Sequence, residues 1–216
     1  MIDFAPFILS FKLASITTII LFIISLPLSW WLSQTSSKLK PFIESITALP
    51  IILPPSVLGF YLLVILSNIT IFGYSFVFNF QALVVASCFY SLPFMVQPLQ
   101  NGFESLNKHI LEASYLAGKS KLQTVWYVAL PNIKPAVITA LIITFAHTVG
   151  EFGVVLMVGG SIPNETKVAS VAIYEMVEMM DYSMAHIYSA IMIGLSLIVL
   201  LSVYIFNHKY NKRFGL

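Results

Sequence analysis

Long apolar runs alternate with short polar segments along the whole chain. The apolar runs are Leu13–Leu32, Ser45–Ser67, Phe76–Leu99, Pro135–Val158, which Glu151 interrupts, and Tyr182–Phe206. About 20 apolar residues in a helix cross a hydrocarbon core of about 30 Å, and lipid forces the backbone groups of such a run to pair within the helix. The pattern predicts an all-α polytopic membrane protein with five transmembrane helices and a loop at Asn68–Ser75.

Composition supports a membrane environment. The 216 residues are 58% hydrophobic and only 9% charged, whereas soluble domains carry about 25% charged residues. Mean hydropathy is +0.91. The single cysteine, Cys88, lies inside an apolar run, and no histidine and cysteine spacing resembles a metal site. We expect neither a metal nor a cofactor.

Basic residues gather on one side of the predicted membrane. With five spans, all but Lys12 and Lys167 of the 11 lysines and arginines fall on that side. They are Lys38, Lys40, Lys108, Lys119, Lys121, Lys134, Lys209, Lys212 and Arg213. Because positive charge remains in the cytoplasm, we expect the N-terminus outside and the C-terminus inside. The opposite connection, before the last span, carries Glu165, Glu175, Glu178 and Asp181.

The cytoplasmic loop of residues 104–134 is too long for a plain connector between packed helices. It predicts two short helices, Lys108–Ala117 and Lys121–Leu130, from local capping signals. These are Asn107 before the first helix, Gly118 after it, and Ser120 with Gln123 in a capping box before the second. The first helix is more apolar than a solvated loop requires, so it should meet a partner.

Gly118-Lys119-Ser120 reads like the end of a phosphate-binding loop. That motif needs a glycine five positions earlier and a preceding strand. This chain has Ala113 there and a predicted helix before it. We therefore expect no nucleotide binding and no enzymatic activity in this chain, so that any ATP would be hydrolysed by another polypeptide.

The same loop carries a recognisable pattern. Glu112-Ala113-Ser114, then Gly118, then Val128-Ala129-Leu130-Pro131 resembles the EAA loop of permease subunits of binding-protein-dependent ABC importers, with Ser114 for alanine and Val128 for isoleucine. The resemblance implies a single permease domain, residues 1–216, whose residues 104–134 dock on an ATPase. The implied docking residues are Glu112, Ala113, Ser114, Gly118, Leu130 and Pro131.

Family membership of this kind implies a set of partners. These are two copies of an ABC ATPase, a second copy of the permease, an extracytoplasmic binding protein and the lipid of the bacterial inner membrane. Nucleic acid is not expected among them.

Two further segments are similar to the molybdate and sulfate permeases. They are His147–Gly153 with Gly159–Thr166, which follow a GEFG…IPxxT pattern, and Leu49–Gly59, which follows LPxxLPPxxxG. The compact length resembles the molybdate branch. The resemblance implies that the protein imports molybdate by alternating access and that a molybdate-binding protein recognises the anion. Tungstate and sulfate are the alternative substrates.

The spans hold no arginine and, apart from Lys12, no lysine, so a tight anion site is not expected in them. Glu151 is the one carboxylate inside a span, where charge is costly, and it follows His147 by one helical turn. It could be a structural pair, a moving gate element, or the proton relay of an ion-coupled secondary transporter. The candidate gate and pathway residues are Pro54, Pro55, His147, Gly150, Glu151 and Gly153.

Overall fold

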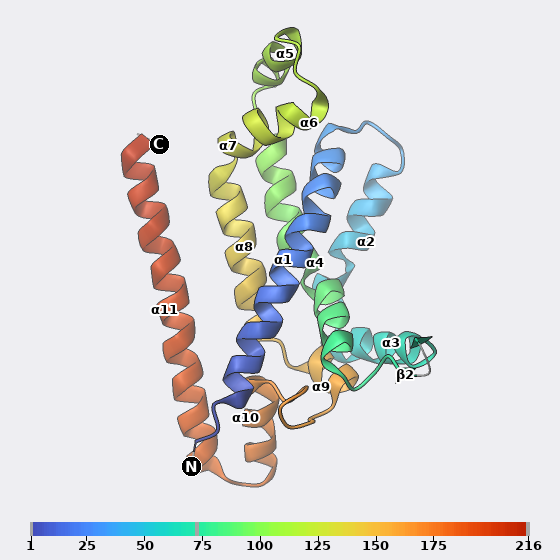
Figure 1. The fold of residues 1–216 in the computed structure, drawn as a ribbon, viewed down its shortest axis with the longest axis vertical. Coiled ribbons are helices and arrows are strands. Elements are labelled where there is room, and N and C mark those ends of the chain that lie inside the picture. Colours follow the sequence, from blue (N-terminus) through green and yellow to red (C-terminus); the bar gives the residue numbers. More distant parts are fainter. Residues whose placement is uncertain (1, 72–73, 215–216) are drawn as a thin grey trace.

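The computed structural model describes residues 2–71 and 74–214, and helices dominate them (Figure 1). The elements are α1 (Ala5–Gln34), α2 (Lys40–Ile52), α3 (Pro55–Ser67), β1 (Thr70–Ile71), β2 (Tyr74–Ser75), α4 (Phe80–Glu104), α5 (Lys108–Leu116), α6 (Lys121–Thr124), the π-helical turn η1 (Val125–Ala129), α7 (Leu130–Asn132), α8 (Lys134–Val149), α9 (Gly153–Gly159), α10 (Ala169–Glu178) and α11 (Tyr182–Phe214). The all-α class is confirmed. The predicted loop at Asn68–Ser75 holds an antiparallel hairpin of two-residue strands.

Helices α1, α4 and α8 form the centre of the bundle, and α2 packs on α4. One cluster of buried side chains between the three central helices contains Leu21, Met95 and Ala140. Glycine permits a close approach of α4 to α8, because a Cβ on Gly102 would lie 2.6 Å from the Cβ of Ala136. The bundle is therefore held by small residues and close packing, as expected for helices in lipid.

The second predicted span is not one helix. Helices α2 and α3 meet at 112°, and Leu53 and Pro54 between them have extended backbone angles. The residue before a proline avoids the helical region, so consecutive prolines force a break rather than a mild bend. Helix α3 consequently runs across the bundle at one end (Figure 1).

The fourth predicted span is also interrupted. Helix α8 ends at Val149, and α9 begins only at Gly153. Three helices, α1, α4 and the part Tyr182–Leu201 of α11, are long and apolar enough to cross a membrane alone. The count among the described residues reaches five if α2 with α3, and α6–α7 with α8, are each taken as one broken span.

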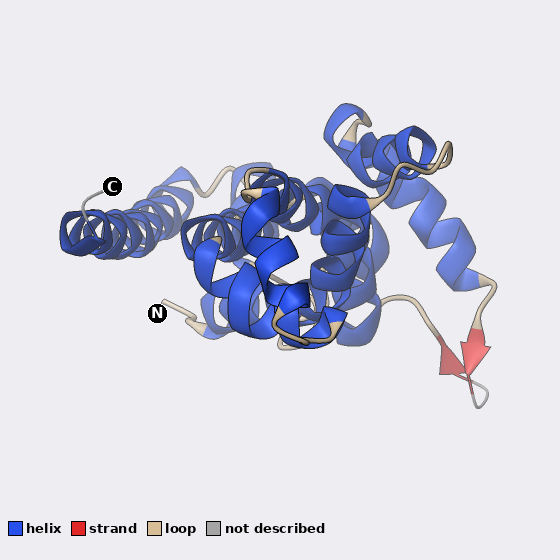
Figure 2. Ribbon diagram, turned by 90° about the horizontal axis from the view of Figure 1, so that it is seen from above, coloured by secondary structure: helices blue, strands red, loops and turns tan. Residues whose placement is uncertain are grey.

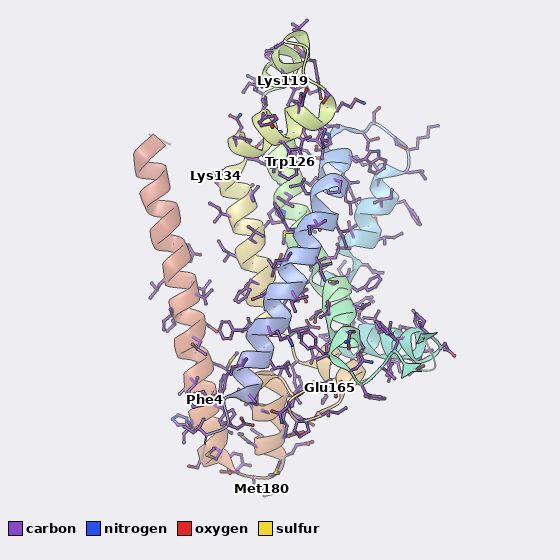
Figure 3. The ribbon with its side chains drawn as sticks, viewed as in Figure 1. Phe4, Lys119, Trp126, Lys134, Glu165 and Met180 are labelled. Atoms are coloured by element: carbon purple, nitrogen blue, oxygen red, sulfur yellow. The ribbon has the colours of Figure 1, made fainter. Side chains whose placement is uncertain are left out.

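The two ends of the bundle differ in charge. Lys119 and Lys134 lie at one end, here called the basic end, and Glu165 lies at the other, the acidic end (Figure 3). The C-terminal end of α11 points to the basic end, whereas the N-terminus lies at the acidic end (Figure 1). This separation is what the five-span arrangement requires. The orientation in the membrane, with the N-terminus outside, stays a prediction.

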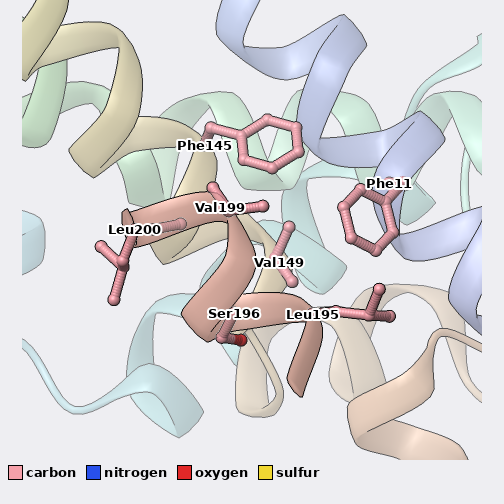
Figure 4. Close-up of a pocket in the computed structure, with 8 residues that line it drawn as sticks. Phe11, Phe145, Val149, Leu195, Ser196, Val199 and Leu200 are labelled. Atoms are coloured by element: carbon pink, nitrogen blue, oxygen red, sulfur yellow. The ribbon is translucent and has the colours of Figure 1, made fainter. Parts of the chain in front are cut away.

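Helix α11 stands at the margin of the bundle, on the side opposite the hairpin (Figure 2). A crevice of about 160 Å³ separates it from α1 and α8. Figure 4 shows its lining side chains, which include Phe11, Phe145 and Leu195 and are apolar except for Ser196. No set of polar groups converges in this crevice, so it is unsuited to hold an oxyanion.

Candidate functional site

The capping pattern predicted at the basic end is confirmed. Asn107 Oδ1 accepts the backbone N–H of His109 at 3.0 Å, and Gly118 ends α5 with φ +77°. Ser120 and Gln123 form the reciprocal capping box before α6. The second predicted helix continues as α6, η1 and α7 to Asn132, with a π-helical turn in the middle.

The predicted docking residues divide into outward and inward groups. Glu112, Ala113, Gly118 and Pro131 are exposed, whereas Leu130 is half-buried. Ser114 is buried, and its hydroxyl lies 2.9 Å from that of Thr124. Ser114 therefore joins α5 to α6 within this chain.

Around the outward residues lies a group of exposed apolar side chains, here called the coupling surface. It consists of Ile110, Tyr115, Leu116, Leu122 and Tyr127. Leu116 is 89% exposed. Exposed apolar groups of this kind at the tip of a protein mark an interaction site, because they reach beyond the bundle whose apolar exterior contacts lipid.

At the acidic end, the break between α8 and α9 faces the start of α3 across an open cleft of about 630 Å³. Its lining is Pro55, Ser56, Tyr90, Ala146, His147, Gly150, Glu151, Phe152 and Gly153. The structure thus brings together the predicted candidates from two distant segments, except Pro54, which precedes the lining. Sequence reasoning missed Ser56 and Tyr90, which carry hydroxyls but belong to no charged or glycine-rich pattern.

His147 is on α8, and its side chain is held by contacts with α4. Its ring stacks on Phe94 with centroids 4.0 Å apart and also contacts Tyr90. Its Nδ1 lies 2.9 Å from Ser91 Oγ, which is also 2.9 Å from Thr148 Oγ1. Since Thr148 donates its proton to the carbonyl of Thr144, Ser91 must donate to Thr148 and accept from His147. Nδ1 therefore carries a hydrogen, and Nε2 remains free to accept or, when protonated, to donate.

Glu151 does not pair with His147, which corrects the predicted sharing of a helical face. The helix ends before Glu151, so the spacing of four residues no longer aligns the two side chains. Glu151 is 3% exposed. Among the described residues, neither of its carboxyl oxygens has a hydrogen-bond partner.

The corner from Gly150 to Phe152, here called the α8–α9 corner, is held by its neighbours. The hydroxyl of Ser170 on α10 donates to the backbone carbonyl of Glu151 at 2.6 Å, and Phe152 packs on Tyr174 with centroids 4.9 Å apart. Helix α9 also lies very close to α3, because a Cβ on Gly153 would be 2.9 Å from the Cβ of Pro55. The first residue of α9 is therefore in close contact with the first residue of α3.

The loop after α9 is organised by Thr166, the threonine of the IPxxT pattern. Its hydroxyl donates to the carbonyl of Gly159 at 2.7 Å and accepts the N–H of Ile162 at 2.9 Å. Thr166 is fully buried. The threonine of the IPxxT pattern therefore stabilises the loop by bonding to the backbone at two points of it.

Replacing Thr166 by valine should destabilise the protein, because both backbone groups lose a buried partner at a cost of about 1–3 kcal/mol. For a chain of this size we expect the thermal denaturation midpoint in detergent to fall by about 5 °C. Thr139→Val, at a half-buried position of α8, is the matched control and should change little. Equal midpoints for the two variants would contradict this role of Thr166.

The acidic end keeps its negative charge. Partial burial raises the pKa of Glu175, but the ion pair with Lys167 outweighs it and holds that pKa below its ordinary value. Lys167 is thus neutralised by Glu175. Glu165, Glu178 and Asp181 remain as exposed acids, so a free dianion approaching this end would be repelled.

Comparison with known proteins agrees with this architecture. Residues 15–214 match the family model described as the binding-protein-dependent transport system inner membrane component. The chain is 45% identical over 210 residues to the molybdenum transport system permease protein ModB of Azotobacter vinelandii, covering 94% of this chain and 93% of that protein. It is 32% identical over 210 residues to a probable sulfate transport system permease protein of Helicosporidium, covering 94% and 78%.

A solved bacterial ABC transporter involved in import of the polysaccharide alginate shares the fold. The TM-score is 0.78 at 14% identity, covering 95% of this chain and 78% of that one. Together with the apolar helices, the family match makes this a multi-pass inner-membrane protein. The chain belongs to the inner-membrane components of binding-protein-dependent transport systems, and among them to the molybdate/sulfate-type permeases of ABC importers.

Proposed function

We propose that this chain forms the translocation pathway of an ATP-driven molybdate importer that works by alternating access. The observation that carries the proposal is the 45% identity, along nearly the whole chain, to a molybdenum transport permease. The sulfate transport relative is less similar, at 32% identity, and sulfate is therefore the second candidate substrate. Tungstate, a close chemical analogue of molybdate, should compete for the same pathway.

The coupling surface is where the ATPase would dock. Leu116 and Leu122 are 89% and 68% exposed, and they flank Lys119 in the sequence, which lies at the basic end (Figure 3). Glu112 on α5 offers an exposed carboxylate, which contacts His109 Nδ1 at 3.3 Å. Burying these apolar side chains against a partner would stabilise the complex by about 25 cal/mol of free energy per Å² of apolar surface removed from water. In the assembled transporter, each of two ATPase copies would contact one permease copy at this surface and transmit its conformational change there.

The cleft at the acidic end would be one half of the pathway. It is open on one side, and the neighbouring face of α3 exposes Val57, Phe60 and Tyr61. We propose that a second copy of the chain covers this face and completes the pathway. Loop closure at the α8–α9 corner would then gate it.

Recognition of the anion would take place outside this chain. The residues that line the cleft within the described structure include no lysine or arginine, and the acidic end repels a dianion. Ser56, Tyr90 and His147 can offer hydrogen bonds without holding the ion tightly. A binding protein that delivers the anion directly to the cleft would supply the tight binding that the cleft lacks and would shield the anion from the acidic end.

Reconstitution tests the proposal. The chain would be placed in proteoliposomes with its ATPase and its binding protein, and molybdate uptake measured with ATP inside. We expect uptake to require hydrolysable ATP, to survive an uncoupler, and to be inhibited more by excess tungstate than by excess sulfate.

Two outcomes would overturn it. Uptake that proceeds without ATP and stops with an uncoupler would favour the ion-coupled transporter in which Glu151 and His147 relay protons. Stronger competition by sulfate than by tungstate would assign the pathway to sulfate instead.

A further inference from the structure

The carboxyl of Glu151 is buried next to the hydroxyl of Ser87. Glu151 is one of the residues that line the cleft, but its side chain is only 3% exposed, and both oxygens lack a completed hydrogen bond to any described residue. The hydroxyl of Ser87 on α4 lies beside it. Ser87 is itself fully buried, and its hydroxyl also lacks a completed bond. A buried carboxyl of the α8–α9 corner and a buried hydroxyl of α4 therefore lie side by side.

Among the described residues, no cation faces this carboxyl. The lysine of the neighbouring α1, Lys12, lies over the ring of Phe80, 4.6 Å from its centroid. On α4 the neighbouring titratable groups are Cys88 and Tyr90, which would both be anions if ionised. On α8, His147 turns its Nδ1 to Ser91. On α10, Tyr174 donates to Glu178, and Glu175 is paired with Lys167.

The packed elements α3 and α9 add no charged side chain near the corner, because Pro55–Ser67 and Gly153–Gly159 contain none. An ionised carboxylate in such a place is strongly disfavoured, because burial removes it from water and no opposite charge compensates. The neutral acid, which can donate its proton to a neighbouring hydroxyl, satisfies the site far better.

The neutral form also suits the cargo. A carboxylate here would repel a dianion in the cleft, and the low dielectric of the interior strengthens that repulsion. We propose that Glu151 carries a proton in this conformation and acts as a positioning residue of the α8–α9 corner, so that oxyanion import proceeds while it is neutral and is suppressed when it ionises. This inference rests on the proposed function, since it assigns a state to the same cleft.

The experiment varies only the pH outside the vesicles. Internal pH and ATP are held constant, so that the ATPase works under one condition, while external pH is raised from about 6 to about 9, a range that spans the titration of perturbed carboxyls. In the unmodified protein we expect molybdate uptake to fall about tenfold over this range. In Glu151→Gln, which keeps the shape of the neutral acid but cannot ionise, the fall should disappear.

Glu165→Gln is the matched control, because Glu165 is an exposed carboxylate at the same end; it should retain the fall. Infrared spectroscopy gives a readout that does not depend on transport. The unmodified protein should show the carbonyl band of a protonated carboxylic acid at neutral pH, and Glu151→Gln should lack it. Glu151→Asp, which keeps an ionisable acid, should show the band and retain the fall.

The inference is wrong if the band is absent from the unmodified protein, or if Glu151→Gln still loses uptake as pH rises, which would assign the dependence to His147 or to the binding protein. Should the unmodified protein show no ATP-dependent molybdate uptake at any pH, the proposed function fails. The infrared band then still decides the state of Glu151.

Discussion

Gly118→Val should reduce molybdate uptake about tenfold while the permease remains inserted in the membrane. Gly118 has φ +77°, and a β-branched residue held in this region is strained by about 1–3 kcal/mol. The strain would change the end of α5 and the direction of the coupling surface. ATP hydrolysis by the assembled complex should continue, so that the ratio of molybdate imported to ATP hydrolysed falls.

A second variant separates strain from contact with the partner. No atom of the described residues lies within 4 Å of a Cβ placed on Gly118, and asparagine tolerates the left-handed region. Gly118→Asn should therefore restore the ratio if backbone strain is the cause. If it is as defective as valine, the added side chain collides with the ATPase. An unchanged ratio in Gly118→Val would remove α5 from the coupling path.

Gly153→Ala should also reduce uptake about tenfold, through the opposite end of the bundle. The new Cβ would lie 2.9 Å from the Cβ of Pro55, whose ring cannot rotate away. Overpacking of this kind costs about 1–3 kcal/mol. Helix α3 would have to separate from α9, and the cleft between them would change shape.

Gly194→Ala is the control, because within the described part of the chain no atom lies within 4 Å of a Cβ at that position of α11. Its uptake should equal that of the unmodified protein. Rates of ATP-dependent uptake, corrected for the amount of inserted protein, provide the measurement. Equal uptake in the two variants would show that the contact between α3 and α9 has no part in the pathway.

Helix caps and membrane spans could be predicted from the sequence, because a few neighbouring residues determine each of them. The caps at Asn107, Gly118 and Ser120 lie where predicted, because each depends on a backbone turn and one side chain within it. The apolar runs likewise marked α1 and α4 within several residues, since length and hydropathy alone set a span.

The interruptions were harder to predict because the runs stay largely apolar across them. Hydropathy does not distinguish the bend at Pro54 from a continuous span, and the one charged residue of the corner, Glu151, does not by itself show that the helix ends there. The bond from Ser170 to the backbone of Glu151 joins residues far apart in sequence, so no local spacing could reveal it. The same holds for Ser91 on α4, whose hydroxyl accepts a hydrogen bond from His147 on α8 across 56 residues of sequence.

Helix α8 has 16 residues and is therefore about 24 Å long, shorter than a hydrocarbon core of about 30 Å. It starts at the element that carries the coupling surface and ends at the corner beside Glu151. If its first turn sits at the inner membrane boundary, its last turn stops several ångströms below the outer one. The anion would then enter a cavity that extends into the outer half of the bilayer. Helix α8 alone would connect the bottom of that cavity to the ATPase on the cytoplasmic side.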